Sequence, residues 1–156
     1  KKEKLIIFSR KLNKSKGFPT FAEAITKILD KYKDWSSVVI GDEPREKYNY
    51  RHKRLKYLGW IPYEEVLKYF SKSSITVVPS NWPEPFGRTS LEAGSRGNAV
   101  IISNRGGLPE TISSPVILKE VNSKSIYEQV VNCIKNKKSI ITLKPAFMVF
   151  FMMVSV

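Results

Sequence analysis

The sequence predicts an α/β protein: a doubly wound, parallel sheet of about six strands with helices on both faces. Short runs of apolar residues alternate with segments in which apolar residues recur at helical spacing. Strands and helices that alternate in this way are typical of parallel sheets. The chain has 156 residues, 42% of them hydrophobic, which suits a single domain with its own core.

The first half of the chain opens with an expected strand and helix. The helix is predicted over residues 18–32, where Phe21 and Ile25 share one face. Pro19 suits its first turn, because the missing N–H has no intrahelical acceptor at that position. A second helix is expected to begin at Pro62. The strands of this half are the apolar runs 4–9, 36–42 and 55–59.

The second half continues the same alternation. Cys133, the only cysteine, shares a helical face with Ile126 and Val130. We therefore expect it to be a buried core thiol rather than a nucleophile or a disulfide partner. Strands are expected at residues 75–80, 99–103 and 115–118, and helices at about 88–96 and 123–137.

The end of the chain does not fit this pattern. Residues 145–156 form an almost unbroken apolar run that is too short to span a membrane and has no amphipathic period. We expect a domain over residues 1–144, followed by this tail. The tail is then a last buried strand, a contact for a missing partner domain, or a sequence unrelated to the fold.

The chain is strongly basic, with 27 Lys and Arg residues against 14 Asp and Glu, a formal net charge of +13. This excess suggests an anionic partner such as nucleic acid, a phosphorylated small molecule or an acidic membrane surface, although a lysine-rich composition explains it equally well. No signal peptide opens the chain, and a lone cysteine suits a reducing compartment. We expect a cytoplasmic location, with peripheral contact at the inner membrane surface as a further option.

Two acidic residues flank an expected helix start in the segment from Pro79 to Gly97. Glu84 precedes the helix, and Glu92 lies about one turn inside it. Free N–H groups at a helix start bind anions, Gly87 allows close backbone approach, and Arg88 adds a charge. Because carboxylates would repel a phosphate, we expect Glu84 and Glu92 to bind the paired hydroxyl groups of sugars.

Two cations follow the first expected strand. Arg10 and Lys16 come before Gly17 and the first helix. Ligands of doubly wound sheets bind beyond the carboxyl ends of the strands, which is where these side chains should lie. A guanidinium group and an ammonium group together suit a diphosphate.

The chain resembles the C-terminal, donor-binding half of the family 4 (group 1) retaining glycosyltransferases, which have the GT-B fold. The pattern of two glutamates eight residues apart is weak by itself, but the whole set of motifs occurs in the order and spacing of the family over residues 5–138. The motifs are "SR…KG" (9–17), "VVIGDEP" (38–44), "YLGWIPYEEV" (57–66), "PSNWPEPFGRTSLEAGSRGNAVI" (79–101) and "GGLPE" (106–110).

The resemblance implies a Rossmann-like domain that binds a nucleoside-diphosphate sugar. Arg10 and Lys16 would hold the donor diphosphate, and Glu92 would bind the ribose. Glu84 would bind the transferred sugar. The backbone of Phe86, Gly87 and Arg88 would assist Glu84, and the turn of Trp60 and Ile61 would flank the base.

The implied reaction is transfer of the sugar to an acceptor with retention of configuration, as in polysaccharide biosynthesis. Arg10, Lys16 and Glu84 are the candidate catalytic residues. Donors of Arg10 and Lys16 aimed at the leaving diphosphate would stabilise its growing negative charge, and Glu84 would hold the sugar that is transferred. The sequence has no Asp-x-Asp motif to hold a metal. We therefore expect neither a metal nor a cofactor other than the donor substrate.

The family's N-terminal domain, which carries the acceptor site and a candidate catalytic histidine, has no counterpart in the sequence. The only histidine, His52, lies in a charged segment and is expected to be solvated. We expect the chain to bind a donor but to be inactive without an N-terminal domain, supplied in cis or in trans. The chain is then an excised domain, a truncated reading frame or a separate subunit.

Three other functions remain open at this stage. A non-catalytic module that binds nucleotide sugars would share every feature described above, and an epimerase of nucleotide sugars has the same broad fold. A nucleic-acid-binding domain is supported by net charge alone. No RNA-recognition motif or basic recognition helix is apparent, so no nucleic-acid partner is expected.

Overall fold

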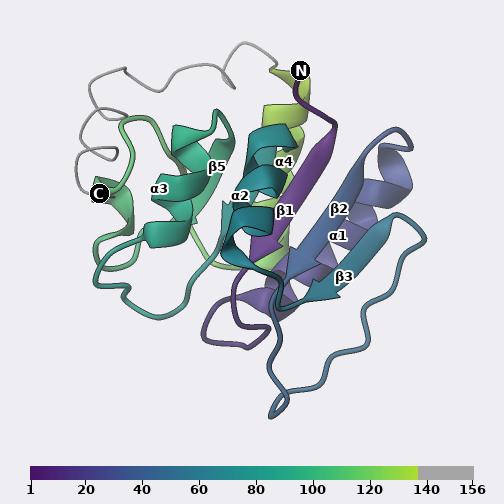
Figure 1. Ribbon diagram of the computed structural model, residues 1–156, viewed down its shortest axis with the longest axis horizontal. Coiled ribbons are helices and arrows are strands. Elements are labelled where there is room, and N and C mark those ends of the chain that lie inside the picture. The colour runs from purple at the N-terminus through teal and green to yellow at the C-terminus, as the bar shows by residue number, and fades with distance from the viewer. Residues whose placement is uncertain (137–156) are drawn as a thin grey trace.

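The computed structural model describes residues 1–136, which form a six-stranded sheet flanked by helices (Figure 1). The order across the sheet is β3-β2-β1-β4-β5-β6, and every neighbouring pair is parallel. The predicted doubly wound parallel sheet is therefore confirmed. The strands are β1 (Leu5–Ser9), β2 (Ser36–Ile40), β3 (Leu55–Gly59), β4 (Ile75–Val78), β5 (Ala99–Ser103) and β6 (Val116–Leu118).

Helices cover both faces of the sheet, so the domain has three layers. Helices α1 and α4 pack together on one face, and α2 and α3 pack together on the other. A short 3-10 helix, η1 (Leu108–Glu110), lies between β5 and β6. The α-helices are α1 (Phe18–Lys31), α2 (Tyr63–Lys72), α3 (Arg88–Ser95) and α4 (Ser123–Lys135).

The strands are buried on both faces, which explains why they read as continuous apolar runs. In β1, Ile6 and Phe8 pack into the cluster beneath α1 and α4. Their neighbours Leu5 and Ile7 pack into the cluster beneath α2 and α3. Successive side chains of a strand point to opposite faces of the sheet, so one central strand contributes residues to both cores.

The direction of winding changes between β1 and β4. From β1 the chain winds outward through β2 to β3, and it then returns to place β4 on the other side of β1. Ligands of open α/β sheets bind at such a switch point, beyond the carboxyl ends of the strands. The loops that begin at Arg10 and Pro79 lie at this position.

The observed elements match the expected ones within about two residues. Strand β2 ends at Ile40 rather than at residue 42, because Gly41 leaves the strand conformation with φ 126°, although its N–H still donates to the Gly59 carbonyl of β3. Strand β4 ends at Val78, since Pro79 has no N–H to donate to the ladder. The expected last residue of α4, the domain boundary at 144 and the tail 145–156 lie outside the described residues.

The cysteine prediction is confirmed. Cys133 is buried in the cluster beneath α1 and α4, and burial raises the pKa of its thiol to about 11. A thiol held protonated in this way packs as an apolar side chain. Across residues 1–136, no helix has both the length and the apolar character needed to cross a membrane.

Candidate functional site

Two loops meet at the switch point of the sheet. The backbone N–H of Arg10 donates to the Ile40 carbonyl, which links the ends of β1 and β2. The N–H of Asn81 donates to the Ser15 carbonyl at 2.9 Å, so the loop after β4 lies against the loop after β1. Gly17 allows this contact: its φ is +76°, and a Cβ atom there would lie 1.9 Å from the Pro79 carbonyl oxygen.

Three of the predicted site residues form one ion-pair cluster. Nη2 of Arg10 and Nζ of Lys16 both donate to Oε1 of Glu84, at 2.5 and 2.6 Å. The hydroxyl group of Ser80 lies 2.8 Å from the same oxygen. Two cations and one carboxylate leave this cluster with a net charge of +1, and the side chains of Arg10 and Glu84 are only 10% and 9% exposed.

The cluster has unused hydrogen-bonding groups. Nη1 of Arg10 is the one buried side-chain nitrogen or oxygen within residues 1–136 that has no hydrogen-bond partner. Every hydrogen bond to the Glu84 carboxylate goes to Oε1, so its Oε2 accepts none from the described residues. A buried donor without a partner costs free energy that a ligand oxygen can recover.

The Glu84 carboxyl group is held in its ionised form. Burial by itself raises its pKa, but hydrogen bonds from Lys16 and Ser80 and the charge of Arg10 together lower the pKa below its ordinary value of 4.5. An ionised carboxylate can only accept hydrogen bonds. Glu84 is therefore equipped to bind hydroxyl groups of a ligand through its remaining oxygen.

The lowered pKa of Glu84 predicts how stability depends on pH. A carboxyl group whose pKa is lower in the folded than in the unfolded protein stabilises the fold above the unfolded pKa, and this contribution is lost as the pH falls through the folded pKa. Below about pH 4.5, the free energy of unfolding should therefore fall more steeply for the wild type than for Glu84→Gln. Urea denaturation of both proteins from pH 7 to pH 3 checks this, and parallel curves would contradict it.

Glu92, the second predicted glutamate, belongs to a separate cluster with Tyr63 and Arg88. Oε1 of Glu92 accepts hydrogen bonds from the Tyr63 hydroxyl and from Nε of Arg88, both at 2.9 Å. The guanidinium group of Arg88 also lies over the Tyr63 ring, 5.5 Å from its centroid. Glu92 is buried, and its Oε2 accepts no hydrogen bond from residues 1–136. No hydrogen bond within the described chain joins this cluster to that of Glu84.

The start of α3 lies between the two clusters, as expected. Gly87 is the N-cap and is buried; a Cβ atom there would lie 2.4 Å from Oγ of Ser90. The first N–H groups of a helix have no intrahelical acceptor. The N–H of Arg88 donates to the Phe86 carbonyl at 3.1 Å, whereas those of Thr89 and Ser90 have no backbone partner among the described residues and can bind a ligand. Beside this helix start, Phe86 and Arg88 are exposed.

The expected base-binding turn lies at the same edge of the sheet. Trp60 follows Gly59, whose carbonyl accepts the N–H of Gly41 at the end of β2. Trp60 is 64% exposed, which leaves its ring free to stack on a ligand, and Ile61 packs against the cluster beneath α2 and α3. The backbone bonds thus bring the ends of β1, β2 and β3 side by side.

The glycine turn, formed by Gly106 and Gly107, contacts the backbone of Glu84. Gly106 has φ +55°, and a Cβ atom there would lie 2.3 Å from the carbonyl oxygen of Glu84. The N–H of Gly107 donates to this same carbonyl at 2.7 Å. The segment "GGLPE" therefore positions the backbone of Glu84.

Sequence reasoning missed two hydroxyl partners and was wrong about His52. Ser80 bonds Glu84 and Tyr63 bonds Glu92, but no sequence pattern marks a hydroxyl that orients a carboxylate. The side chain of His52 is only 11% exposed, not solvated. Its Nε2 contacts Asp30 at 3.0 Å and its Nδ1 accepts the N–H of Arg54, so it joins the β2–β3 connection to α1.

The described residues hold no group of three or more His, Cys, Asp or Glu side chains arranged to bind a metal.

Comparison with known families gives a clear match. The family model described as "Glycosyl transferases group 1" matches residues 1–142. An uncharacterized glycosyltransferase of Methanocaldococcus jannaschii is 32% identical over 133 residues, which are 80% of this chain and 32% of that protein. The chain thus spans about a third of this relative.

Solved structures of similar fold agree with this match. The C-terminal domain of a glycosyl transferase group 1 family protein (LpcC) from Francisella tularensis superposes with a TM-score of 0.78 at 26% identity, covering 96% of this chain and 84% of that one. Alr3699/HepE of Anabaena, solved in complex with UDP-glucose, also gives a TM-score of 0.78, at 18% identity, over 95% of this chain and 43% of that one.

Proposed function

Because the chain belongs to the group 1 glycosyl transferases and has the fold of a C-terminal domain of that family, we propose that it binds the nucleoside-diphosphate sugar of a retaining transferase. One observation carries this proposal. Arg10, Lys16 and Glu84 meet at the switch point of the sheet, with a net positive charge and a buried guanidinium nitrogen that lacks a partner.

In this proposal, the cations bind the diphosphate. Nη1 of Arg10 and the N–H groups at the start of α3 donate to phosphate oxygens, and Lys16 adds a point charge. The proposal is supported by the Anabaena protein, which contains a domain of this fold and was solved in complex with UDP-glucose. We take a UDP-sugar as the first ligand to test.

The carboxylates bind sugar hydroxyl groups through the oxygens that they have free. Oε2 of Glu84 would accept hydrogen bonds from hydroxyl groups of the transferred sugar, and Oε2 of Glu92 from those of the ribose. These are the roles expected from the sequence. The backbone of Phe86, Gly87 and Arg88 would lie along the sugar. Trp60 and Ile61 would flank the base.

Catalysis in this proposal comes from stabilising the leaving group. Negative charge grows on the diphosphate as the glycosidic bond breaks, and Arg10 and Lys16, which meet at Oε1 of Glu84, would bind it. Loss of one such preorganised donor typically costs about 3 kcal/mol of transition-state stabilisation. Because these two side chains supply the positive charge, we propose that the site works without a metal.

The acceptor would bind between this domain and an N-terminal domain, supplied in cis or in trans. The relative from Methanocaldococcus is about three times as long as its match to this chain, which leaves room for such a domain. We propose that residues 1–156 alone bind the donor and transfer no sugar. The basic surface would also allow peripheral contact with an anionic membrane.

Calorimetric titration tests the proposed donor site. The chain should bind at least one of UDP, GDP and ADP, and the matching nucleotide sugar, with the same affinity in the presence and absence of EDTA. If none of these nucleotides or nucleotide sugars bound, the donor site would be refuted. Binding that EDTA abolishes would refute only the metal-independent part of the proposal.

A further inference from the structure

The connection between β2 and β3, which the structure describes in full, contains no helix of any kind, whereas the β5–β6 connection has the 3-10 helix η1 and the other three have α-helices. An α-helix fills the β1–β2, β3–β4 and β4–β5 connections, whereas residues 41–54, all described, contain no helix. Aromatic side chains cover the sheet there instead. Phe18 of α1 lies edge to face with the rings of Tyr48, Tyr50 and Tyr57, at centroid distances of 5.8, 6.5 and 6.2 Å.

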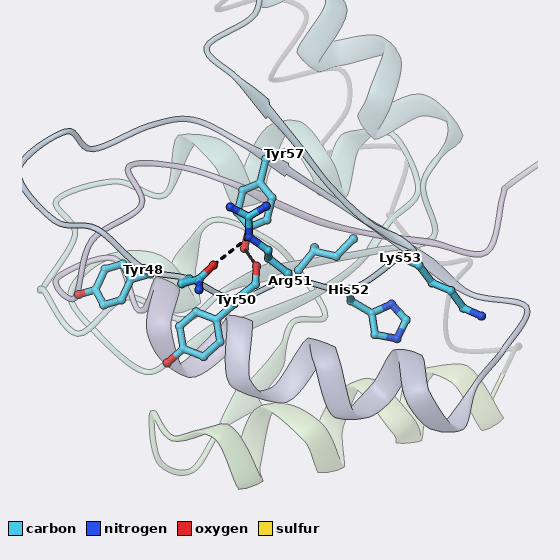
Figure 2. A pocket seen from close by; sticks show the side chains of 8 residues that line it. Tyr48, Tyr50, Arg51, His52, Lys53 and Tyr57 are labelled. Atoms are coloured by element: carbon cyan, nitrogen blue, oxygen red, sulfur yellow. Dashed lines mark hydrogen bonds between the residues drawn. The ribbon is translucent and has the colours of Figure 1, made fainter.

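These aromatic side chains leave a cavity of about 740 Å³ on the α1 side of the edge strand β3 (Figure 2). We call it the tyrosine pocket. Its volume lies in the range of small-molecule binding sites. Tyr48 and Tyr57 are 38% and 41% exposed, so these residues are accessible to a ligand. The lining residues are Tyr48, Asn49, Tyr50, Arg51, His52, Lys53, Leu55 and Tyr57.

The polar side chains of the tyrosine pocket include two cations, Arg51 and Lys53. Arg51 uses Nε to bind Oδ1 of Asn49 at 2.9 Å, and within residues 1–136 its two terminal nitrogens have no partner. Figure 2 shows Arg51 and Tyr57 among the side chains that line this pocket. Lys53 is exposed without a bond to the described residues, and no carboxylate is among the lining residues. Two carboxylates border the pocket and are already paired there, Glu46 with the Tyr48 hydroxyl at 2.6 Å and Asp30 with His52 at 3.0 Å. The lining therefore favours an anion.

A second cavity, of about 640 Å³, adjoins the first at Tyr48, which lines both. It lies over the start of α1 and contains Lys14 and Asn81, again without an acidic residue. Gly17 in its wall directly follows Lys16 of the proposed donor site in the chain. Two adjoining cavities of this kind suit an extended ligand better than a compact one.

We propose that the tyrosine pocket and the adjoining cavity bind an acidic oligosaccharide. Sugar rings have apolar C–H faces that pack on aromatic rings, and their hydroxyl groups match the donors of Asn49 and Tyr50. Arg51 and Lys53 pair with the acidic groups. The choice of a glycan rather than a single-stranded nucleic acid, which also favours aromatic rings with cations, rests on the proposed function.

NMR titration of the full chain with hexagalacturonate tests this proposal. Amide shifts should change at residues 48–57, and the change should persist in saturating UDP, since UDP would occupy the cations near Glu84. Arg51→Gln should weaken hexagalacturonate binding about tenfold, because it removes a charge-assisted contact. Lys33→Gln, which removes an exposed cation outside both cavities, is the matched control and should have no effect.

Four outcomes would overturn the proposal: no binding of hexagalacturonate, equal binding of neutral cellohexaose, equal weakening by both substitutions, or a preference for the oligonucleotide dT8 at the same residues. Each of them leaves UDP binding unaffected. If the chain bound hexagalacturonate but not UDP, the donor site would be refuted and the proposed function of the tyrosine pocket would stand. Arg51 is exposed and bonds only Asn49, so its variant is expected to fold.

Discussion

Arg10→Ala should weaken UDP binding by about 100-fold, which corresponds to about 3 kcal/mol. The substitution removes the buried Nη1 that has no partner in the free protein, and it lowers the net charge of the cluster from +1 to 0. Charge-assisted hydrogen bonds contribute about 1.5–3 kcal/mol each, and an arginine can make two of them to one phosphate. Calorimetric titration with UDP measures the effect.

The neighbouring residue supplies a matched control for Arg10. Lys11 is exposed and has no hydrogen bond to the described residues, so Lys11→Ala removes the same charge from the same loop. It should change UDP affinity by less than about twofold, because exposed charges are screened by salt. If the two variants bound UDP equally well, the Arg10 cluster would not be the diphosphate site.

Much of this site could be predicted from the sequence, because it follows from topology. Arg10, Lys16 and Glu84 each come shortly after a strand, and β1 and β4 are neighbours at the switch point. Once the strands are assigned, these side chains must gather at one edge of the sheet. The motif order pointed to the same three residues.

The pairing within the site could not be predicted. From the sequence, Glu84 was expected to bind sugar hydroxyls, since a carboxylate would repel a phosphate, and its pairing with the two cations was not expected. In the structure it also holds both cations, through Oε1 alone. Which oxygen accepts which donor depends on side-chain rotamers and on distances of a few tenths of an ångström, and no spacing in a sequence encodes them. The roles of Ser80 and Tyr63 were missed for the same reason.

The tyrosine pocket was missed for a different reason. The sequence showed a charged, tyrosine-rich segment between two strands, and a doubly wound fold usually places a helix at such a position. The absence of helical period over residues 41–54 could have indicated that this side of β3 lacks a helix. That the tyrosines gather on Phe18 depends on tertiary packing.

Gly106→Ala should lower the free energy of unfolding by about 3 kcal/mol or more, and it should also weaken binding of a nucleotide sugar. The new Cβ atom would lie 2.3 Å from the carbonyl oxygen of Glu84 and 2.6 Å from its backbone nitrogen. Either the turn or Glu84 must move, which would break the bond from Gly107 and shift the carboxylate away from Arg10. Urea denaturation and titration with UDP-glucose measure the two effects.

Gly59 separates steric overlap from backbone strain. Its φ is +66°, close to the +55° of Gly106, but a Cβ atom there would meet no atom within 4 Å. Gly59→Ala should therefore cost only the left-handed strain of about 1–2 kcal/mol. The difference between the two variants measures how firmly the glycine turn holds Glu84. If both lost the same free energy and Gly106→Ala kept full affinity for UDP-glucose, the turn would not position the carboxylate, and Glu84 would be held by its ion pairs alone.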